Sequence, residues 1–205
     1  MANHEHAIDA RATFITLMLR EDHQKLKELF DQFGKTTNNS EKQNIVTAAI
    51  AALEVHATLE EELIYPAWKE HVDEQSLTDE ALAEHHAVHL LIKELMEINP
   101  EDQRYNATFT VLSEHVRHHI KEEEGKMFRQ AEKADLDWDR LTKHVIERRQ
   151  RLEQKPLWIL GVPVIVSARE TVAATRGVLS YRPVPSSASD PAGRLTLGPE
   201  TAQAD

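Results

Sequence analysis

Two segments of the chain repeat one spacing of histidine and glutamate. His56 is followed four positions later by Glu60, and His119 is followed in the same way by Glu123. Residues four apart on a helix lie one turn apart on the same face, so each pair can reach a single metal ion. Imidazole and carboxylate together suit iron and other first-row transition metals. The spacing therefore predicts two halves of a metal site.

A second repeat lies upstream of each pair. His23 stands 33 residues before His56, and His85 stands 34 residues before His119. His23 and His85 each follow an acidic residue and precede apolar residues at plus three, plus six and plus seven. This pattern is typical of two similar helical hairpins that pack about a pseudo-two-fold axis. The repeats together select six candidate metal ligands: His23, His56, Glu60, His85, His119 and Glu123.

The simpler interpretation is that these residues are core histidines and a solvated glutamate run. Buried His and Glu are costly unless they are paired or bound to metal, so packing alone explains a repeated set poorly. Six protein ligands exceed the three of a catalytic zinc ion and suit two ions that share bridging carboxylates. His89, one turn after His85, is a seventh candidate ligand. His115 is expected in the core or beside the site, and His86 and His118 in solvent.

Four long amphipathic helices are needed to bring these residues together. Apolar residues recur at helical spacing in four segments, and a weaker fifth segment follows. The predicted helices cover 7–33, 41–71, 76–98, 101–134 and 137–154. We therefore predict an all-α protein, an up-down-up-down four-helix bundle with an internal two-hairpin repeat, plus a C-terminal helix and an irregular tail.

Local features refine these helices. Ser40, with Gln43 at the capping-box position, is the predicted N-cap of the second helix. Pro66 is expected to bend that helix or end its regular part, and Asn99-Pro100 ends the third. The first helix is expected to bury one stripe of apolar side chains: Phe14, Leu17, Met18, Leu26, Leu29 and Phe30.

Helix breakers concentrate after Lys155, where six of the eight prolines and four of the six glycines lie. The predicted organisation is a bundle at 1–135, an additional helix at 136–155 and a Pro/Gly-rich tail at 156–205. Within the tail, the apolar segment 157–166 is too short to span a bilayer. We expect it to pack on the bundle or on a second subunit, which would make the protein a homo-oligomer. Pro163 argues against a regular central strand or helix there.

Composition limits the function classes. The chain has no cysteine, so a metal site must use histidine and carboxylate. A net charge of -11 disfavours binding to nucleic-acid phosphates. No apolar run reaches the roughly 18 to 20 residues of a spanning helix, and the first residues lack a signal-peptide core. We therefore expect a soluble, cytoplasmic protein with no nucleic-acid partner and no transmembrane segment.

The motifs resemble those of the hemerythrin-like HHE cation-binding domain over about residues 10–135. The resemblance rests on His23, on His56 to Glu60 continuing into Glu61 and Tyr65-Pro66, on Glu84-His85, and on His119 to Glu123. It implies a non-haem di-iron centre, bridged by two carboxylates and an oxo or hydroxo group from solvent, with the six repeat-related residues as ligands. Hemerythrins proper have a His-x3-His pair on the third helix, which His85 and His89 reproduce. They end with His-x4-Asp, whereas His119-x3-Glu123 is nearer to bacterial HHE proteins linked to oxygen, nitric oxide, peroxide or iron handling.

Three functions fit this reading. The leading hypothesis is a non-enzymatic protein whose two Fe ions bind O2 or NO for sensing, storage or stress protection, although Zn or Mn could occupy the same ligands. The second is an enzyme that decomposes peroxide or reduces NO, with Tyr65, Tyr105 or His115 as a proton or electron relay. The third is an iron-responsive interaction module, which the apolar tail segment motivates. The side chains expected to keep water from the site are Leu59, Leu63, Leu91, Ile120 and Met127.

Overall fold

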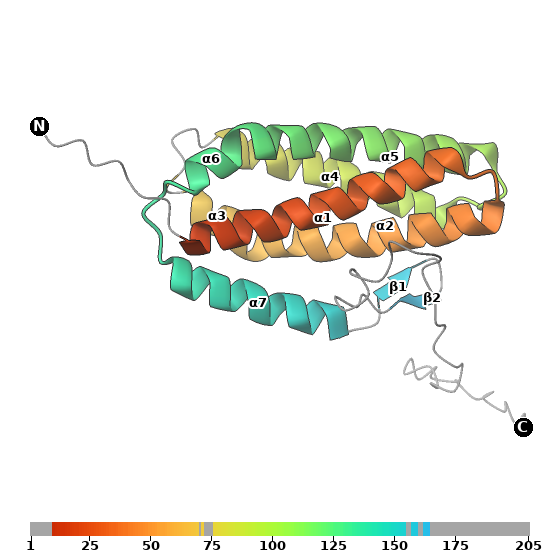
Figure 1. Cartoon of the computed structure of the whole chain (residues 1–205). Coiled ribbons are helices and arrows are strands. Elements are labelled where there is room, and N and C mark those ends of the chain that lie inside the picture. Colours follow the sequence, from red (N-terminus) through yellow and green to blue (C-terminus); the bar gives the residue numbers. More distant parts are fainter. Residues whose placement is uncertain (1–9, 70, 72–75, 155–156, 160–161, 165–205) are drawn as a thin grey trace, which may run out of the picture.

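The computed structural model describes residues 10–69, 71, 76–154, 157–159 and 162–164. Four long helical segments lie side by side in it and alternate in direction (Figure 1). They begin as α1 (Ala10–Lys35), α2 (Asn39–Leu59), α4 (Ser76–Glu97) and α5 (Gln103–Glu122). The predicted up-down-up-down bundle is confirmed. Across the described ranges, none of the helices has both the length and the apolar composition needed to cross a membrane.

Two of the four segments change helix type part-way along. α2 continues through a π-helical turn, η1 (Glu60–Ile64), into α3 (Tyr65–Trp68). α5 continues in the same way through η2 (Glu123–Met127) into α6 (Phe128–Ala131). The second predicted helix is therefore interrupted at Glu60, before the proline that was expected to bend it.

Helix α7 (Trp138–Gln154) lies along the outside of the bundle (Figure 1). It packs against α1, α2 and η1 and buries Trp138, Leu141 and Val145. The fifth helix that the sequence predicts is thus present, and it covers the hairpin formed by α1 and α2.

Two short strands follow α7. β1 (Leu157–Ile159) pairs with β2 (Val162–Val164) in an antiparallel register that sets Trp158 opposite Pro163. The sequence argued against a regular central strand at Pro163, and the pairing of β1 with β2 does not contradict this. Both strands of a two-stranded sheet are edge strands, where a residue without an N–H is tolerated. β1 lies beside α2, so this part of the predicted apolar segment is next to the bundle.

The bundle core consists of two apolar clusters separated by a layer of buried polar side chains. In the cluster nearer the loop between α1 and α2, the rings of Phe30 and Phe109 are 5.7 Å apart. In the cluster at the other end, the rings of Trp68 and Phe128 are 5.9 Å apart. His23 lies in α1 between the residues of the two clusters and is fully buried. The apolar clusters on either side shield this layer from water.

Two local predictions for the first hairpin are wrong. Phe14 and Leu17 are 45% and 52% exposed, because the buried face of α1 passes through Ile15, Leu19 and His23 instead. That face continues the helical phase of the apolar residues farther along α1, whereas Phe14 and Leu17 are out of phase with it. The N-cap of α2 is Asn38 rather than Ser40, since Asn38 Oδ1 accepts a hydrogen bond from Glu41 N at 3.0 Å.

Candidate metal centre

The polar layer brings the six repeat-related residues together. Their ligand atoms form two groups within which all atoms lie within 4.8 Å of one another. One group contains His23, His56, Glu60 and Glu123, and the other contains Glu60, His85 and His119. All six side chains are buried, which is unusual for histidine and glutamate without a partner or a metal.

The two groups are related by the internal repeat. His23 Nε2 lies 3.2 Å from His56 Nε2, and His85 Nε2 lies 3.2 Å from His119 Nε2. Glu60 Oε2 stands between the groups, 3.2 Å from His56 Nε2 and 3.4 Å from His85 Nε2. This is the position of a carboxylate that two ions could share.

Glu123 occupies the equivalent position on the other side. Its Oε2 lies 3.2 Å from His23 Nε2 and 3.5 Å from His119 Nε2. Each glutamate thus faces one histidine from each hairpin. The centre is complete only when the two hairpins pack together.

The π-helical turns begin at these two glutamates. Tyr65 N donates to the carbonyl oxygen of Glu60, and Phe128 N donates to that of Glu123, so each turn spans one residue more than an α-helical turn. Such turns occur mostly as single insertions in α-helices and often at functional sites. Here the wider turn follows directly after the carboxylate that reaches the buried layer.

Within each hairpin, an acidic side chain contacts Nδ1 of one histidine, the ring nitrogen that faces away from the buried layer. Asp22 Oδ2 lies 3.4 Å from His56 Nδ1, and Glu84 Oε2 lies 2.8 Å from His119 Nδ1. Asp22 and Glu84 are the acidic residues directly before His23 and His85, so each supports the histidine on the neighbouring helix of its hairpin. The sequence repeat contained these residues, but it did not indicate their contacts.

The other two histidines have a carboxylate at Nδ1 that comes from the opposite hairpin. It belongs to the residue directly after Glu60 or Glu123. Glu61 Oε1 lies 2.9 Å from His85 Nδ1, and Glu124 Oε1 lies 2.9 Å from His23 Nδ1. The hydrogen bond from His85 lowers the pKa of Glu61, so this carboxylate accepts rather than donates. Each of the four histidines thus has a carboxylate oxygen near Nδ1 and turns Nε2 toward the layer. A carboxylate at Nδ1 favours the tautomer that a metal-binding histidine uses, with the proton on Nδ1 and Nε2 available to a cation.

This arrangement is favourable when cations are bound and costly when they are absent. The Nε2 lone pairs converge in a layer where neither Glu60 oxygen nor Glu123 Oε2 has a hydrogen-bond partner among the described residues. Burial, and next the charge of Glu123, raises the pKa of Glu60 well above its usual range. Burial also lowers the pKa of His56 to about 4, although Asp22 opposes this shift. Two positive ions would balance the carboxylates and use every free lone pair.

Comparisons with known proteins give the family and the fold. A family model of the hemerythrin HHE cation-binding domain matches residues 15–131. The chain belongs to this family. A crystal structure of an HHE cation-binding domain-containing protein from Mycobacterium kansasii has the same fold, with a TM-score of 0.57 and 21% sequence identity. The alignment covers 71% of this chain and 88% of that one. A comparison with curated proteins found no match.

His89 is the candidate ligand that the HHE bundle does not bring into either group. Its side chain is 39% exposed, with Nε2 3.1 Å from Glu61 Oε1 and Nδ1 3.6 Å from Glu54 Oε1. It therefore contacts a carboxylate that supports His85, rather than the buried layer itself. His115, expected in the core or beside the site, is exposed on α5. His86 and His118 are exposed as predicted.

Tyr65 reaches the HHE centre from the first residue of α3. Its hydroxyl donates to Glu123 Oε1 at 2.7 Å and lies 3.5 Å from His119 Nε2. Burial, together with the nearby carboxylates, raises the pKa of Tyr65 well above its usual range, so the hydroxyl keeps its proton. Of the other predicted features, Leu59, Ile120 and Met127 are buried as expected, whereas Leu63 and Leu91 are only partly buried.

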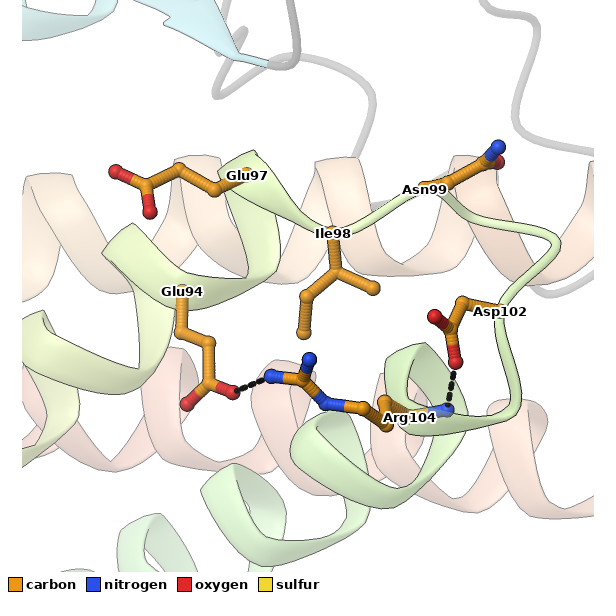
Figure 2. Close-up of a pocket in the computed structure, with 6 residues that line it drawn as sticks. All are labelled: Glu94, Glu97, Ile98, Asn99, Asp102 and Arg104. Carbon is orange, nitrogen blue, oxygen red and sulfur yellow. Dashed lines mark hydrogen bonds and ion pairs between the residues drawn. The ribbon is translucent and has the colours of Figure 1, made fainter.

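A surface pocket lies away from the centre, where α4 leads into α5. Figure 2 shows the six residues that line it: Glu94, Glu97, Ile98, Asn99, Asp102 and Arg104. The Arg104 guanidinium donates to Glu94 Oε1 at 2.8 Å, and Asp102 caps α5 by accepting from Arg104 N at 2.8 Å. None of the candidate ligands lines this pocket, so the metal chemistry belongs to the buried layer.

The supporting carboxylates lead to a first prediction. Glu124→Gln removes the charge behind His23 and allows the wrong imidazole tautomer, so we expect metal affinity to fall roughly 10- to 100-fold. Metal affinity is measured by competition with a chromophoric chelator. Glu122→Gln is the matched control, because Glu122 is exposed and forms its ion pair with the exposed His118. Equal losses in the two variants would contradict the role of Glu124.

Proposed function

We propose that this protein holds two iron ions in the buried layer and binds O2 or NO there, for sensing, storage or stress protection. The observation that carries the proposal is the convergence of four Nε2 atoms on two buried carboxylates, each of which faces one histidine from each hairpin. The ligands we propose are His23, His56, Glu60, His85, His119 and Glu123. Ferrous ions, when bound, would supply electrons and an open coordination position for a diatomic ligand.

The chain's own contribution is to orient the ligands and exclude water. The four supporting carboxylates fix the imidazole rings, and their hydrogen bonds leave Nε2 free for a cation. The apolar clusters above and below the layer leave little room for water. A small, uncharged gas is the kind of ligand that such a dry site admits. His89, which lies outside both groups, is not proposed as a ligand.

The enzymatic alternative is favoured by one observation, the hydrogen bond from Tyr65 to Glu123. Reduction of NO takes up protons together with electrons from a donor, and disproportionation of peroxide passes protons from one molecule to the next, so a buried hydroxyl beside Glu123 can take part in either reaction. In this alternative Tyr65 is a proton relay: its hydroxyl passes a proton on at Glu123 Oε1 only as it receives another, because its raised pKa keeps it protonated at rest. Tyr105, the other tyrosine considered as a relay, lies in the apolar cluster at the far end of the bundle.

The decisive experiment measures metal content and the optical spectrum of protein purified without oxygen, before and after O2 or NO is added. About two irons per chain and a reversible spectral change would support gas binding. Fewer than one metal ion per chain after iron loading would contradict the proposal. If zinc or manganese is bound in place of iron, the metal site is supported but the proposed binding of O2 or NO is contradicted.

Tyr65→Phe separates the two candidate functions. If the protein is an enzyme, this variant should keep its full iron content and consume peroxide or NO more slowly, because only the proton on the hydroxyl is lost. If the protein is a gas-binding protein, wild type and variant should both lack steady turnover. Consumption that proceeds equally fast in both proteins would exclude Tyr65 as the proton donor. Cytoplasmic location and a homo-oligomer formed through residues 157–166 stay predictions beside these proposals.

A further inference from the structure

The two halves of the centre differ in the charges that lie behind their supporting carboxylates. Behind His23, Glu124 contacts two permanent cations, with Lys27 Nζ and Arg20 Nη1 each 3.2 Å from a carboxylate oxygen. Behind His56, the Arg149 guanidinium donates hydrogen bonds to both oxygens of Asp22, one of them at 3.0 Å. Both carboxylates of this half are therefore paired with Lys or Arg, and Arg149 Nη1 also lies 3.8 Å from Glu153 Oε1.

The carboxylates of the other half have no such neighbours. Among the described residues, the ion pairs of Glu61 are with His85 and His89 alone. Those of Glu84 are likewise with histidines, one of them the His119 that it supports. Lysine and arginine keep their charge throughout the neutral range, whereas an imidazole does not. Among the described residues, the carboxylates that support His85 and His119 therefore keep a charge that no Lys or Arg offsets.

Arg149 makes the clearest difference because it comes from outside the repeat. It lies on α7, after the residues 15–131 that match the family, and its side chain is only 19% exposed. Asp22 Oδ2 is shared between Arg149 and His56, and its distance to His56 Nδ1 is 3.4 Å. The three other carboxylate–histidine distances are 2.8 to 2.9 Å. A carboxylate that accepts two hydrogen bonds from an arginine guanidinium forms a weaker hydrogen bond with its histidine.

We propose that α7 makes the two metal positions unequal through Arg149, which weakens cation binding at the His23–His56 position relative to the His85–His119 position. Arg149 is a positioning residue that acts through Asp22 and His56. The inference rests on the proposed two-ion centre and adds an order of filling to it. The first ion enters at His85 and His119, and the second enters at His23 and His56.

The test is an anaerobic titration of the metal-free, full-length protein with Co²⁺, read from its visible absorption and by competition with a chelator. Two stepwise affinities are expected, since the first ion repels the second even at equal positions. The quantity of interest is therefore the change in their ratio between variants. Arg149→Gln should tighten the second step roughly 10-fold and leave the first unchanged, because Asp22 then places its full charge behind His56.

Two further variants separate this role from a structural one. Arg149→Lys keeps the charge beside Asp22 and should retain the wild-type ratio. Arg148→Gln removes a neighbouring arginine of α7 that pairs with the exposed Glu62 at 2.7 and 2.8 Å, so it should also leave the ratio unchanged. An unchanged ratio in Arg149→Gln, or an equal change in Arg148→Gln, would overturn the inference while the two-ion centre stands. Failure of wild type to bind two Co²⁺ ions would instead refute the proposed function.

Discussion

His56→Ala and His119→Ala are each expected to leave a folded bundle that no longer holds two metal ions. Each substitution removes one of the two imidazoles of one group, so the affinity of that position should fall by more than the roughly 10- to 100-fold typical of an outer contact. The lost imidazole also leaves its carboxylate, Asp22 or Glu84, without the hydrogen bond it now accepts. Iron per chain, measured after loading and desalting, should fall from about two to about one or fewer.

The matched control is His86→Ala, which removes an exposed histidine from the same helix as His85. It should keep the full iron content. Circular dichroism and thermal melting of the metal-free proteins show whether each variant is folded. If His56→Ala and His119→Ala both retain two irons, the ligand assignment is wrong, whatever metal the protein carries.

Glu60→Gln is expected to abolish binding of the two metal ions and yet to stabilise the metal-free protein. Glu60 is fully buried and faces the second carboxylate, Glu123, and neither of its oxygens has a hydrogen-bond partner in the part of the chain that the structure describes. The neutral amide keeps the shape but removes the cost of a buried, uncompensated charge. We expect a gain of about 1 to 3 kcal/mol in the free energy of unfolding at neutral pH.

The pH dependence of the metal-free protein should change in the same variant. Because the folded-state pKa of Glu60 is raised, the folded protein binds more protons than the unfolded chain. Stability from this group is therefore present at low pH and is lost as the pH rises from the ordinary glutamate pKa of 4.5 through the raised pKa of the folded state. Urea denaturation of chelator-treated protein should show this loss in wild type and a smaller one in Glu60→Gln.

Glu62→Gln serves as the control, because Glu62 lies in the same π-helical turn but is exposed and paired with Arg148. It should neither stabilise the metal-free protein nor reduce iron content. A Glu60→Gln variant that is less stable than wild type without metal would show that Glu60 serves packing rather than a cation. Such an antagonism between stability and function is common where a site holds strained or uncompensated groups.

The amino-acid sequence determined the helices and the six residues of the centre. Helical periodicity is a local property, so the four bundle segments and α7 could be predicted from short-range patterns alone. The repeat added long-range information, since two hairpins with the same spacing place equivalent residues at equivalent depths. His23, His56, His85 and His119 were found in this way without knowledge of the packing.

Only the tertiary structure decided which groups support these ligands. Glu61 and Glu124 were visible as neighbours of the glutamates, but their contacts cross from one hairpin to the other, and no sequence spacing encodes that crossing. Arg149 meets Asp22 across 127 positions in the chain. His89 has the spacing of a ligand, yet its side chain lies toward Glu61 and Glu54 rather than into the buried layer. Spacing along a helix fixes only the face on which a side chain lies, whereas its partners and the field around it depend on how separate helices pack.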